Sequence, residues 1–219
     1  MPAILLAAGA VADEGRTRPC SRWRRSRPPA ATLERLATHD ALTDLANRRY
    51  LLEALDREGR RARREALPMS LILADIDFFK NYNDSLGHQA GDACLARVGA
   101  ALESALRRPA DLLARYCGEQ FVALLPGTAE EGALQVAASM RERVGALDLP
   151  HPAGAAGGRV TVSLGVASLA AGENLSGETL IARADEAMYR AKDAGRDRVE
   201  AWSPRPPAEA GLPRGPRTS

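Results

Sequence analysis

The chain has 219 residues, of which 45% are hydrophobic and 26% are charged, and its formal net charge is +2. This balance fits one globular domain with a substantial core plus tails. The small net charge argues against a nucleic-acid partner, and three scattered cysteines supply no disulfide framework and no metal-ligand spacing. Because no apolar run reaches the roughly 20 residues that cross a bilayer, we expect no membrane span and a cytoplasmic location.

Both ends of the chain have a composition typical of disorder. Residues 1–31 combine many Arg with Pro and Ser, and residues 203–219 form a Pro-rich tail without an apolar pattern. We therefore expect one domain over residues 32–202, with Thr32 capping a short helix at its start. A basic cluster at residues 57–64 is interpreted as the solvated face of a helix or, alternatively, as a phosphate-facing patch.

The sequence predicts three helices and three strands in the first half of the domain. Asn47 can cap a helix over residues 48–66, because Leu residues repeat there at helical spacing. An apolar strand is expected over 71–74. The elements expected after it are helices over 78–85 and 90–106 and two strands over 112–116 and 121–125, joined as a β-hairpin.

The second half predicts a further alternation of helix and strand. A helix over 129–144 is followed by a Gly/Pro-rich loop and a strand over 159–168. Ser176 is expected to cap a helix that runs to about residue 194, where Gly195 ends it. A last short strand is expected over 198–202.

Two carboxylates, Asp75 and Asp77, follow the apolar strand at its end. Ionised carboxylates beside apolar surface are costly unless they are paired or bound to metal. Side chains at i and i+2 of a strand share a face, so both carboxylates are in position to reach one ion, and a structural role is the alternative for Asp77. A few hard oxygen ligands suit Mg²⁺, which takes the rest of its shell from water and substrate phosphates. The segment therefore predicts a site for a metal–nucleotide complex.

Four blocks of this sequence resemble the GGDEF domain of diguanylate cyclases. Asp-Ile-Asp-Phe-Phe-Lys-Asn-Tyr-Asn-Asp-Ser-Leu-Gly-His-Gln-Ala-Gly-Asp at 75–92 and Arg-Tyr-Cys-Gly-Glu-Gln-Phe at 115–121 are similar to its two central motifs. Residues 40–49 and 185–196 resemble its entry motif and its final helix. The resemblance implies an α+β fold with a central, mostly antiparallel sheet flanked by helices, related to the polymerase palm and to nucleotidyl cyclases.

The resemblance also implies a reaction, in which two GTP molecules condense into cyclic di-GMP and release two pyrophosphates. Each step is the attack of a ribose 3′-hydroxyl on an α-phosphate, which needs positioning and charge neutralisation. Two Mg²⁺ ions per active site would clamp the reacting oxygens, with Mn²⁺ as an alternative ion. Each domain holds one GTP, so a homodimer is required for catalysis.

Residue roles follow from the same resemblance. The implied metal ligands are Asp75, the backbone carbonyl of Ile76, and Glu119, and the implied catalytic residues are Glu119 and Lys80. The implied substrate-binding residues are Phe78, Phe79, Lys80, Asn83, Asp92, Lys192 and Arg196. Free N–H groups at the start of the helix after the strand suit phosphate, and Lys192 and Arg196, four apart, are expected to share a helix face. A carboxylate at Asp92 accepts from guanine N1–H and N2–H₂, which adenine cannot supply.

A second nucleotide site is implied by Arg108 and Asp111, which resemble the family's Arg-x-x-Asp motif for product inhibition. The family's additional Arg on the next helix is Ser139 here, with Arg141 nearby.

The signature loop departs from the family at two positions. Cys117 replaces its first Gly, which we expect to be tolerated unless the residue needs a positive φ. Gln120 replaces the acid that follows Glu119. These departures favour an alternative function, a catalytically degenerate GGDEF domain that binds GTP or cyclic di-GMP as a receptor. A truncated, unproductive fragment is a third interpretation, suggested by the N-terminus.

Overall fold

The computed structural model describes residues 35, 37–152, 154, 158–173 and 176–204. Thr32 and the two terminal segments predicted to be disordered lie outside this part, apart from Ser203 and Pro204. The elements, in chain order, are β1 (Ala46–Asn47), α2 (Arg48–Glu65), β2 (Met69–Ile76), α3 (Phe79–Leu86), α4 (His88–Ser104), β3 (Leu112–Cys117), β4 (Gln120–Pro126), α5 (Glu130–Gly145), β5 (Val162–Leu169), α6 (Gly177–Asp193) and β6 (Val199–Ala201).

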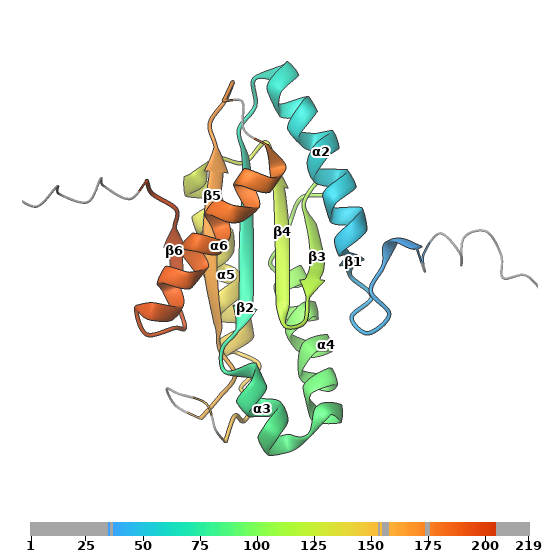
Figure 1. Cartoon of the computed structure of the whole chain (residues 1–219), viewed down its shortest axis with the longest axis vertical. Helices are drawn as coiled ribbons and strands as arrows, with labels where there is room; N and C mark the ends of the chain where they lie inside the picture. The colour runs from blue at the N-terminus through green and yellow to red at the C-terminus, as the bar shows by residue number, and fades with distance from the viewer. Residues whose placement is uncertain (1–34, 36, 153, 155–157, 174–175, 205–219) are drawn as a thin grey trace, which may run out of the picture.

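The strands form one sheet in the order β1-β3-β4-β2-β5-β6, shown in Figure 1. The pairs β3–β4, β4–β2 and β2–β5 are antiparallel, whereas the edge strands β1 and β6 pair in parallel. This mixed sheet confirms the predicted α+β fold with a mostly antiparallel sheet. Strand β2 lies at the centre, so the residues at its end reach two neighbouring strands at once.

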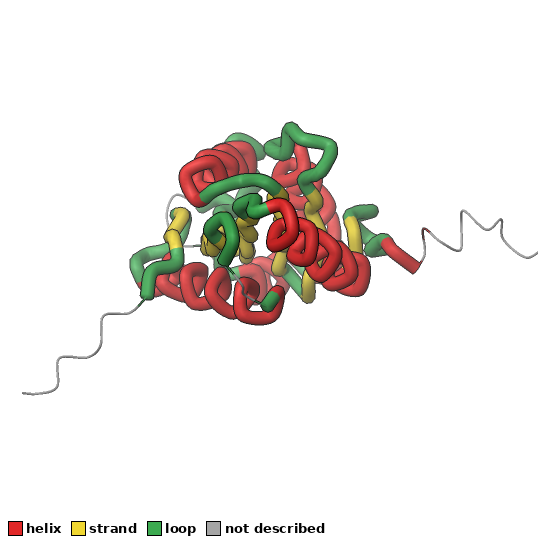
Figure 2. Tube along the Cα trace, turned by 90° about the horizontal axis from the view of Figure 1, so that it is seen from above, coloured by secondary structure: helices red, strands yellow, loops and turns green. Residues whose placement is uncertain are grey.

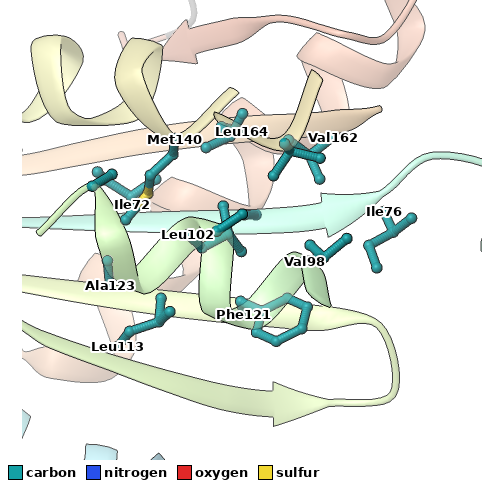
Figure 3. Close-up of a cluster of buried hydrophobic side chains, with 14 of the residues drawn as sticks. Ile72, Ile76, Val98, Leu102, Leu113, Phe121, Ala123, Met140, Val162 and Leu164 are labelled. Carbon is teal, nitrogen blue, oxygen red and sulfur yellow. The ribbon is translucent and has the colours of Figure 1, made fainter. Parts of the chain in front are cut away.

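Helices cover both faces of the sheet, as Figure 2 shows from above. One face packs against α3, α4 and α5, and its core includes Ile72, Val98, Phe121, Met140 and Leu164, drawn in Figure 3. The other face packs against α2 and α6 in a second cluster. Successive β2 residues alternate between the two clusters, as the period-two geometry of a strand requires. β2 is therefore buried along its whole length.

Helix α6 lies unusually close to the sheet because Gly165 has no side chain. A Cβ atom at Gly165 would lie 2.1 Å from the carbonyl oxygen of Ala184 and 2.2 Å from the nitrogen of Met188. Such distances exclude any larger residue without displacement of the helix. The close contact fixes the height of α6 over β5, and with it the position of the last helical turn.

Most predicted elements are present, with shifted boundaries. The caps are confirmed, since the side chain of Asn47 accepts from the backbone N–H of Tyr50 and that of Ser176 accepts from Thr179. Strand β2 extends beyond the predicted residues 71–74 at both ends because it is paired on both sides. The two-residue strand β1 was not predicted, since it is too short to show a pattern.

The basic cluster on α2 is largely neutralised by acidic residues of the same helix. Arg57, Arg60, Arg61 and Arg64 form ion pairs with Asp56, Glu58 and Glu65. This pairing favours the solvated helix face over a phosphate patch. Helix α2 also rises toward the end of the molecule opposite α3 (Figure 1). Within the described residues, no helix has the length and apolar character needed to cross a membrane.

Candidate active site

The site is centred on Asp75, the second-last residue of β2. The carboxylate is only 4% exposed, and its cross-strand partners are Gln120 on β4 and Ser163 on β5. Lys192 Nζ lies 2.8 Å from Oδ1 of Asp75, and Gln120 Nε2 donates to Oδ2 at 3.2 Å. Burial raises the pKa of the Asp75 carboxyl, although the contacts with Lys192 and Gln120 oppose the rise.

Glu119 lies beside this carboxylate, on the turn that joins β3 to β4. It is half-buried, and its negative charge contributes to the raised pKa of Asp75, after the larger effect of burial. No group of three or more His, Cys, Asp or Glu side chains that could hold a metal occurs in the described part of the chain. Two carboxylates and the carbonyl of Ile76 are few, hard oxygen donors, which fits Mg²⁺ completed by water and phosphates.

Both departures from the family signature lie in this hairpin and contact each other. The Cys117 thiol donates to Oε1 of Gln120 at 3.0 Å, while the amide nitrogen of Gln120 faces Asp75. Within residues 117–119, only Gly118 has a positive φ, of 51°. Cys117 therefore replaces Gly without the backbone strain that a positive φ would impose, in agreement with the expectation from the sequence.

The contacts of Asp77 favour its structural role over an ion shared with Asp75. Asp77 directly follows strand β2, which ends at Ile76. Asp77 is 2% exposed and accepts from the hydroxyls of Thr161 and Ser163, each at 2.7 Å, and from the backbone N–H of Asp197 at 3.2 Å. Its role is to join the end of β2 to β5 and to the turn after α6.

The segment after β2 turns sharply and presents the start of α3. Phe78 caps this helix with φ 54° and no side-chain hydrogen bond, so the first N–H groups of α3 have no side-chain acceptor there, as phosphate binding requires. The side chain of Phe79 is buried and stacks on Tyr82, which leaves only its backbone for a ligand. Lys80 is exposed at the same helix start.

Lys192 and Arg196 both lie at the C-terminal end of α6, but not on one helix face as predicted. The helix ends at Asp193, and Arg196 follows in a turn with φ 64°, since Gly195 has already ended the helix. The guanidinium of Arg196 lies 4.2 Å from the ring centroid of Phe78. The turn therefore brings Arg196 to the start of α3, and Lys192 points to Asp75.

Asn83, on α3, lies against α4 at the residue before Asp92. A Cβ atom at Gly91 would lie only 1.8 Å from Oδ1 of Asn83, so the Asn83 side chain lies directly against α4, one residue before Asp92. Oδ1 of Asn83 is buried without a hydrogen-bond partner among the described residues. Asp92 is exposed. A buried amide oxygen without a partner, close in the fold to the helix that carries Asp92, suits a ligand with N–H donors.

The predicted second site lies at the opposite end of β3. Arg108 donates its backbone N–H to Oδ2 of Asp111, and its guanidinium donates to Thr128 at 3.1 Å. Burial raises the pKa of Asp111, and its Oδ1 has no partner within the described chain. Both residues line a cavity of about 320 Å³ together with Ser139.

Arg143, not Arg141, is the arginine beside Ser139. The guanidinium of Arg143 donates to Ser139 Oγ at 3.3 Å and to Ser104 Oγ at 3.1 Å. Arg141 instead pairs with Asp197 at 3.1 Å. The sequence placed Arg141 near this site because it is close in number, but two residues along a helix turn the side chain by about 200°.

Sequence reasoning missed two contacts that brace the site. His151 is buried, and its Nε2 lies 3.2 Å from the carbonyl oxygen of Phe78, but a single His in a Gly/Pro-rich loop carries no signal of this. Arg115 donates to Asp40 at 3.1 Å and to the carbonyl of Gly118 at 2.9 Å. The contact between Arg115 and Asp40 links the entry motif to the signature hairpin, and both residues lie in motifs named above.

Comparison with known proteins identifies the same domain. The family model "Diguanylate cyclase, GGDEF domain" matches residues 37–198. The response regulator PleD of Caulobacter vibrioides is 43% identical over 164 residues, 75% of this chain and 36% of its own length. Diguanylate cyclase DgcP of Pseudomonas aeruginosa is 41% identical over 164 residues, 75% of this chain and 24% of its own. The chain thus spans about a third or less of these relatives.

Solved structures agree with this placement. The coiled coil and GGDEF domain of DgcB from Caulobacter crescentus, in complex with c-di-GMP, has a TM-score of 0.70 at 35% identity, covering 78% of this chain and 88% of that one. The active GGEEF domain of a diguanylate cyclase from Vibrio cholerae has a TM-score of 0.64 at 32% identity, covering 73% and 98%. The chain belongs to the GGDEF domain family of diguanylate cyclases.

Proposed function

We propose that this chain condenses two GTP molecules into cyclic di-GMP and releases two pyrophosphates. The observation that carries the proposal is the pairing of Asp75 with Lys192 beside Glu119. A buried carboxylate whose pKa is raised by burial is costly to the fold, and a metal–nucleotide site is the function that explains its position. The proposed setting is the cytoplasm, where GTP is available.

Asp75, Glu119 and the carbonyl of Ile76 are the residues proposed to hold Mg²⁺. The ion would neutralise phosphate charge and polarise the α-phosphate toward the attacking 3′-hydroxyl. Lys192 lies in the same site and forms an ion pair with Asp75. When the nucleotide binds, Lys192 would exchange this ion pair for one with the triphosphate. The N–H groups at the start of α3 and the exposed Lys80 add further donors.

Guanine recognition is assigned to Asn83 and Asp92. The Asp92 carboxylate accepts from N1–H and N2–H₂, and the buried Oδ1 of Asn83 accepts a further N–H. Adenine presents an acceptor at N1 and no amino group at C2, so it leaves these oxygens without partners.

Catalysis is proposed to need a homodimer. One domain presents one guanine pocket and one pair of acids, whereas the reaction joins two nucleotides head to tail. Two copies with their sites facing each other would bring each 3′-hydroxyl to the opposite α-phosphate.

A degenerate receptor is the second candidate function. The neutral Gln120, held between Cys117 and Asp75, removes one negative charge from the site and favours this candidate. The positions of Glu119, Asp75 and Lys192 support the enzyme. In either case, Arg108, Asp111 and the cavity beside them are proposed to bind cyclic di-GMP, which in the enzyme would inhibit the reaction.

The deciding experiment incubates purified protein with GTP and Mg²⁺ and separates the products by chromatography. Cyclic di-GMP is the expected product, and Glu119→Ala should abolish it while the circular dichroism spectrum stays unchanged. GTP bound by the wild type with no product, even at high protein concentration, would establish the receptor instead.

A further inference from the structure

The turn after α6 has a backbone conformation that needs outside support. Arg196 and Asp197 are consecutive residues with positive φ, 64° and 46°. Non-glycine residues rarely adopt this region, and they keep it only where the surrounding structure holds them. The turn also carries the guanidinium that lies over Phe78, so its conformation decides where that charge is placed.

Asp77 holds the turn from inside the fold. Its Oδ2 accepts from the backbone N–H of Asp197 at 3.2 Å and from Thr161 at 2.7 Å, while Oδ1 accepts from Ser163 at 2.7 Å. The carboxylate is almost fully buried. The Asp77 carboxylate is bound to β5, and Asp77 directly precedes Phe78. Asp77 therefore fixes the position of the turn relative to the start of α3.

Arg141, a residue of helix α5, contacts the same turn from the surface side. Its Nη1 lies 3.1 Å from Oδ1 of Asp197 and 3.4 Å from the Asp197 carbonyl oxygen. The Arg141 side chain is 38% exposed, so it adds little to the hydrophobic core. Asp197 is therefore fixed at its N–H by Asp77 and at its side chain by Arg141.

We infer that Asp77 and Arg141 are positioning residues that hold Arg196 in place for the nucleotide triphosphate. Neither touches the site of reaction; both act through Asp197 on its neighbour. The inference rests on the proposed function, because it takes Arg196 as a phosphate contact. It adds that an arginine on α5, a helix without an assigned active-site residue, controls nucleotide affinity.

The test measures the Kd of 3′-deoxyGTP with Mg²⁺ by calorimetry, since this nucleotide lacks the attacking hydroxyl and cannot react. Arg196→Ala and Arg141→Ala should each weaken binding by roughly three- to thirtyfold, which lies within the range of coupling energies between residues in contact. In the double variant, Arg141→Ala should add nothing to the effect of Arg196→Ala. A residue that acts only through another loses its effect when the other is gone.

Three controls separate positioning from loss of charge or of structure. Arg60→Ala removes one positive charge from a surface ion pair on α2 and should leave the Kd unchanged. Arg141→Lys keeps a cation for Asp197 and should recover part of the affinity. Asp77→Asn should bind nearly as well as the wild type, because its amide oxygen can still accept from Asp197 and Thr161 while the hydroxyl of Ser163 turns to accept from the amide nitrogen, whereas Asp77→Ala should bind weakly.

Thermal melts identify any variant that fails to fold, and Arg141, at the surface, keeps the test available if Asp77→Ala unfolds. An unchanged Kd in Arg141→Ala, or full additivity in the double variant, would overturn the inference while leaving the proposed function intact. An unchanged Kd in Arg196→Ala would likewise overturn only the inference, whereas no binding by the wild type would overturn both.

Discussion

The ammonium group of Lys192 lies 2.8 Å from Oδ1 of Asp75, between the last turn of α6 and the end of β2. The pair joins the residue proposed to hold the metal to a residue proposed to hold the triphosphate. Even with this cation in place, burial keeps the pKa of Asp75 raised. The metal-free fold therefore carries a charged carboxylate that it does not fully compensate.

Replacing Asp75 with Asn should stabilise the metal-free protein. A carboxyl whose folded-state pKa is raised contributes stability at low pH, and this contribution is lost as pH rises through the folded pKa. At neutral pH the charged Asp75 is therefore unfavourable for folding. Asp75→Asn should raise the unfolding free energy by roughly 0.5–2 kcal/mol, the usual gain from removing a functional constraint, as measured by urea denaturation.

Two comparisons check the cause of this gain. The difference in unfolding free energy between wild type and Asp75→Asn should become smaller as pH falls toward the acid range, where wild-type Asp75 becomes protonated. Saturating concentrations of Mg²⁺ and GTP should also reduce this difference, because they stabilise the wild type, which binds them, and not Asp75→Asn. A variant less stable than the wild type at neutral pH would mean that the ion pair with Lys192 outweighs burial.

Gln120→Glu should increase the rate of cyclic di-GMP formation by about tenfold, equivalent to about 1.4 kcal/mol in the barrier. The added carboxylate restores a negative charge beside Asp75, where the amide of Gln120 now donates at 3.2 Å. Initial rates at saturating GTP, with Gln120→Ala as the control for a lost contact, measure the effect. An unchanged rate would mean that a neutral hydrogen-bonding group is sufficient at this position.

The sequence predicted the fold well because its signals are local or belong to long motifs. Asn47 and Ser176 cap helices as their residue types suggest, and the apolar run before Asp75 forms a buried strand. Strand boundaries were less accurate, since pairing partners distant in sequence decide where a strand ends. Strand β1 exists only because Ala46 pairs with Ala114 on β3.

The motifs predicted which of the proposed ligand residues lie near one another, but not the residues that support them. Asp75, Glu119 and Lys192 come together as the motifs imply. Period-two spacing could not show that Asp77 is occupied by donors from Thr161, Ser163 and Asp197. Helical spacing failed for Arg196 because the helix ends before it. Contacts such as that of His151 with the Phe78 carbonyl join elements far apart in the chain, and no local pattern encodes them.

Asp92→Ser should reduce the selectivity for guanine. The serine hydroxyl cannot accept from N1–H and N2–H₂ together, and it removes the unpaired charge that penalises adenine. GTP turnover should fall, and mixed products containing adenine should appear when ATP is supplied with GTP. Asp92 is exposed on α4, so the fold should be unaffected, which a thermal melt would verify. If the variant rejects ATP as strongly as the wild type, another residue reads the base.

Product inhibition should be non-competitive with GTP, because the two sites lie at opposite ends of β3. Asp111 lies six positions before Cys117, a span of roughly 20 Å in a strand. Arg108→Ala should relieve inhibition by cyclic di-GMP without lowering the uninhibited rate. The measurement is the initial rate against added product at several GTP concentrations. Identical curves for wild type and Arg108→Ala would mean that the Arg108 side chain does not bind the product.

Ser139→Arg should strengthen the same inhibition. Ser139 lines the cavity with Arg108 and Asp111, and a guanidinium there adds one charged hydrogen bond, worth roughly 1.5–3 kcal/mol. The product concentration for half-inhibition should fall by about tenfold or more. Arg143 now donates to Ser139 and must move aside, so Ser139→Arg combined with Arg143→Ala tests whether crowding limits the gain. Equal half-inhibition in wild type, single and double variants would place the product outside this cavity.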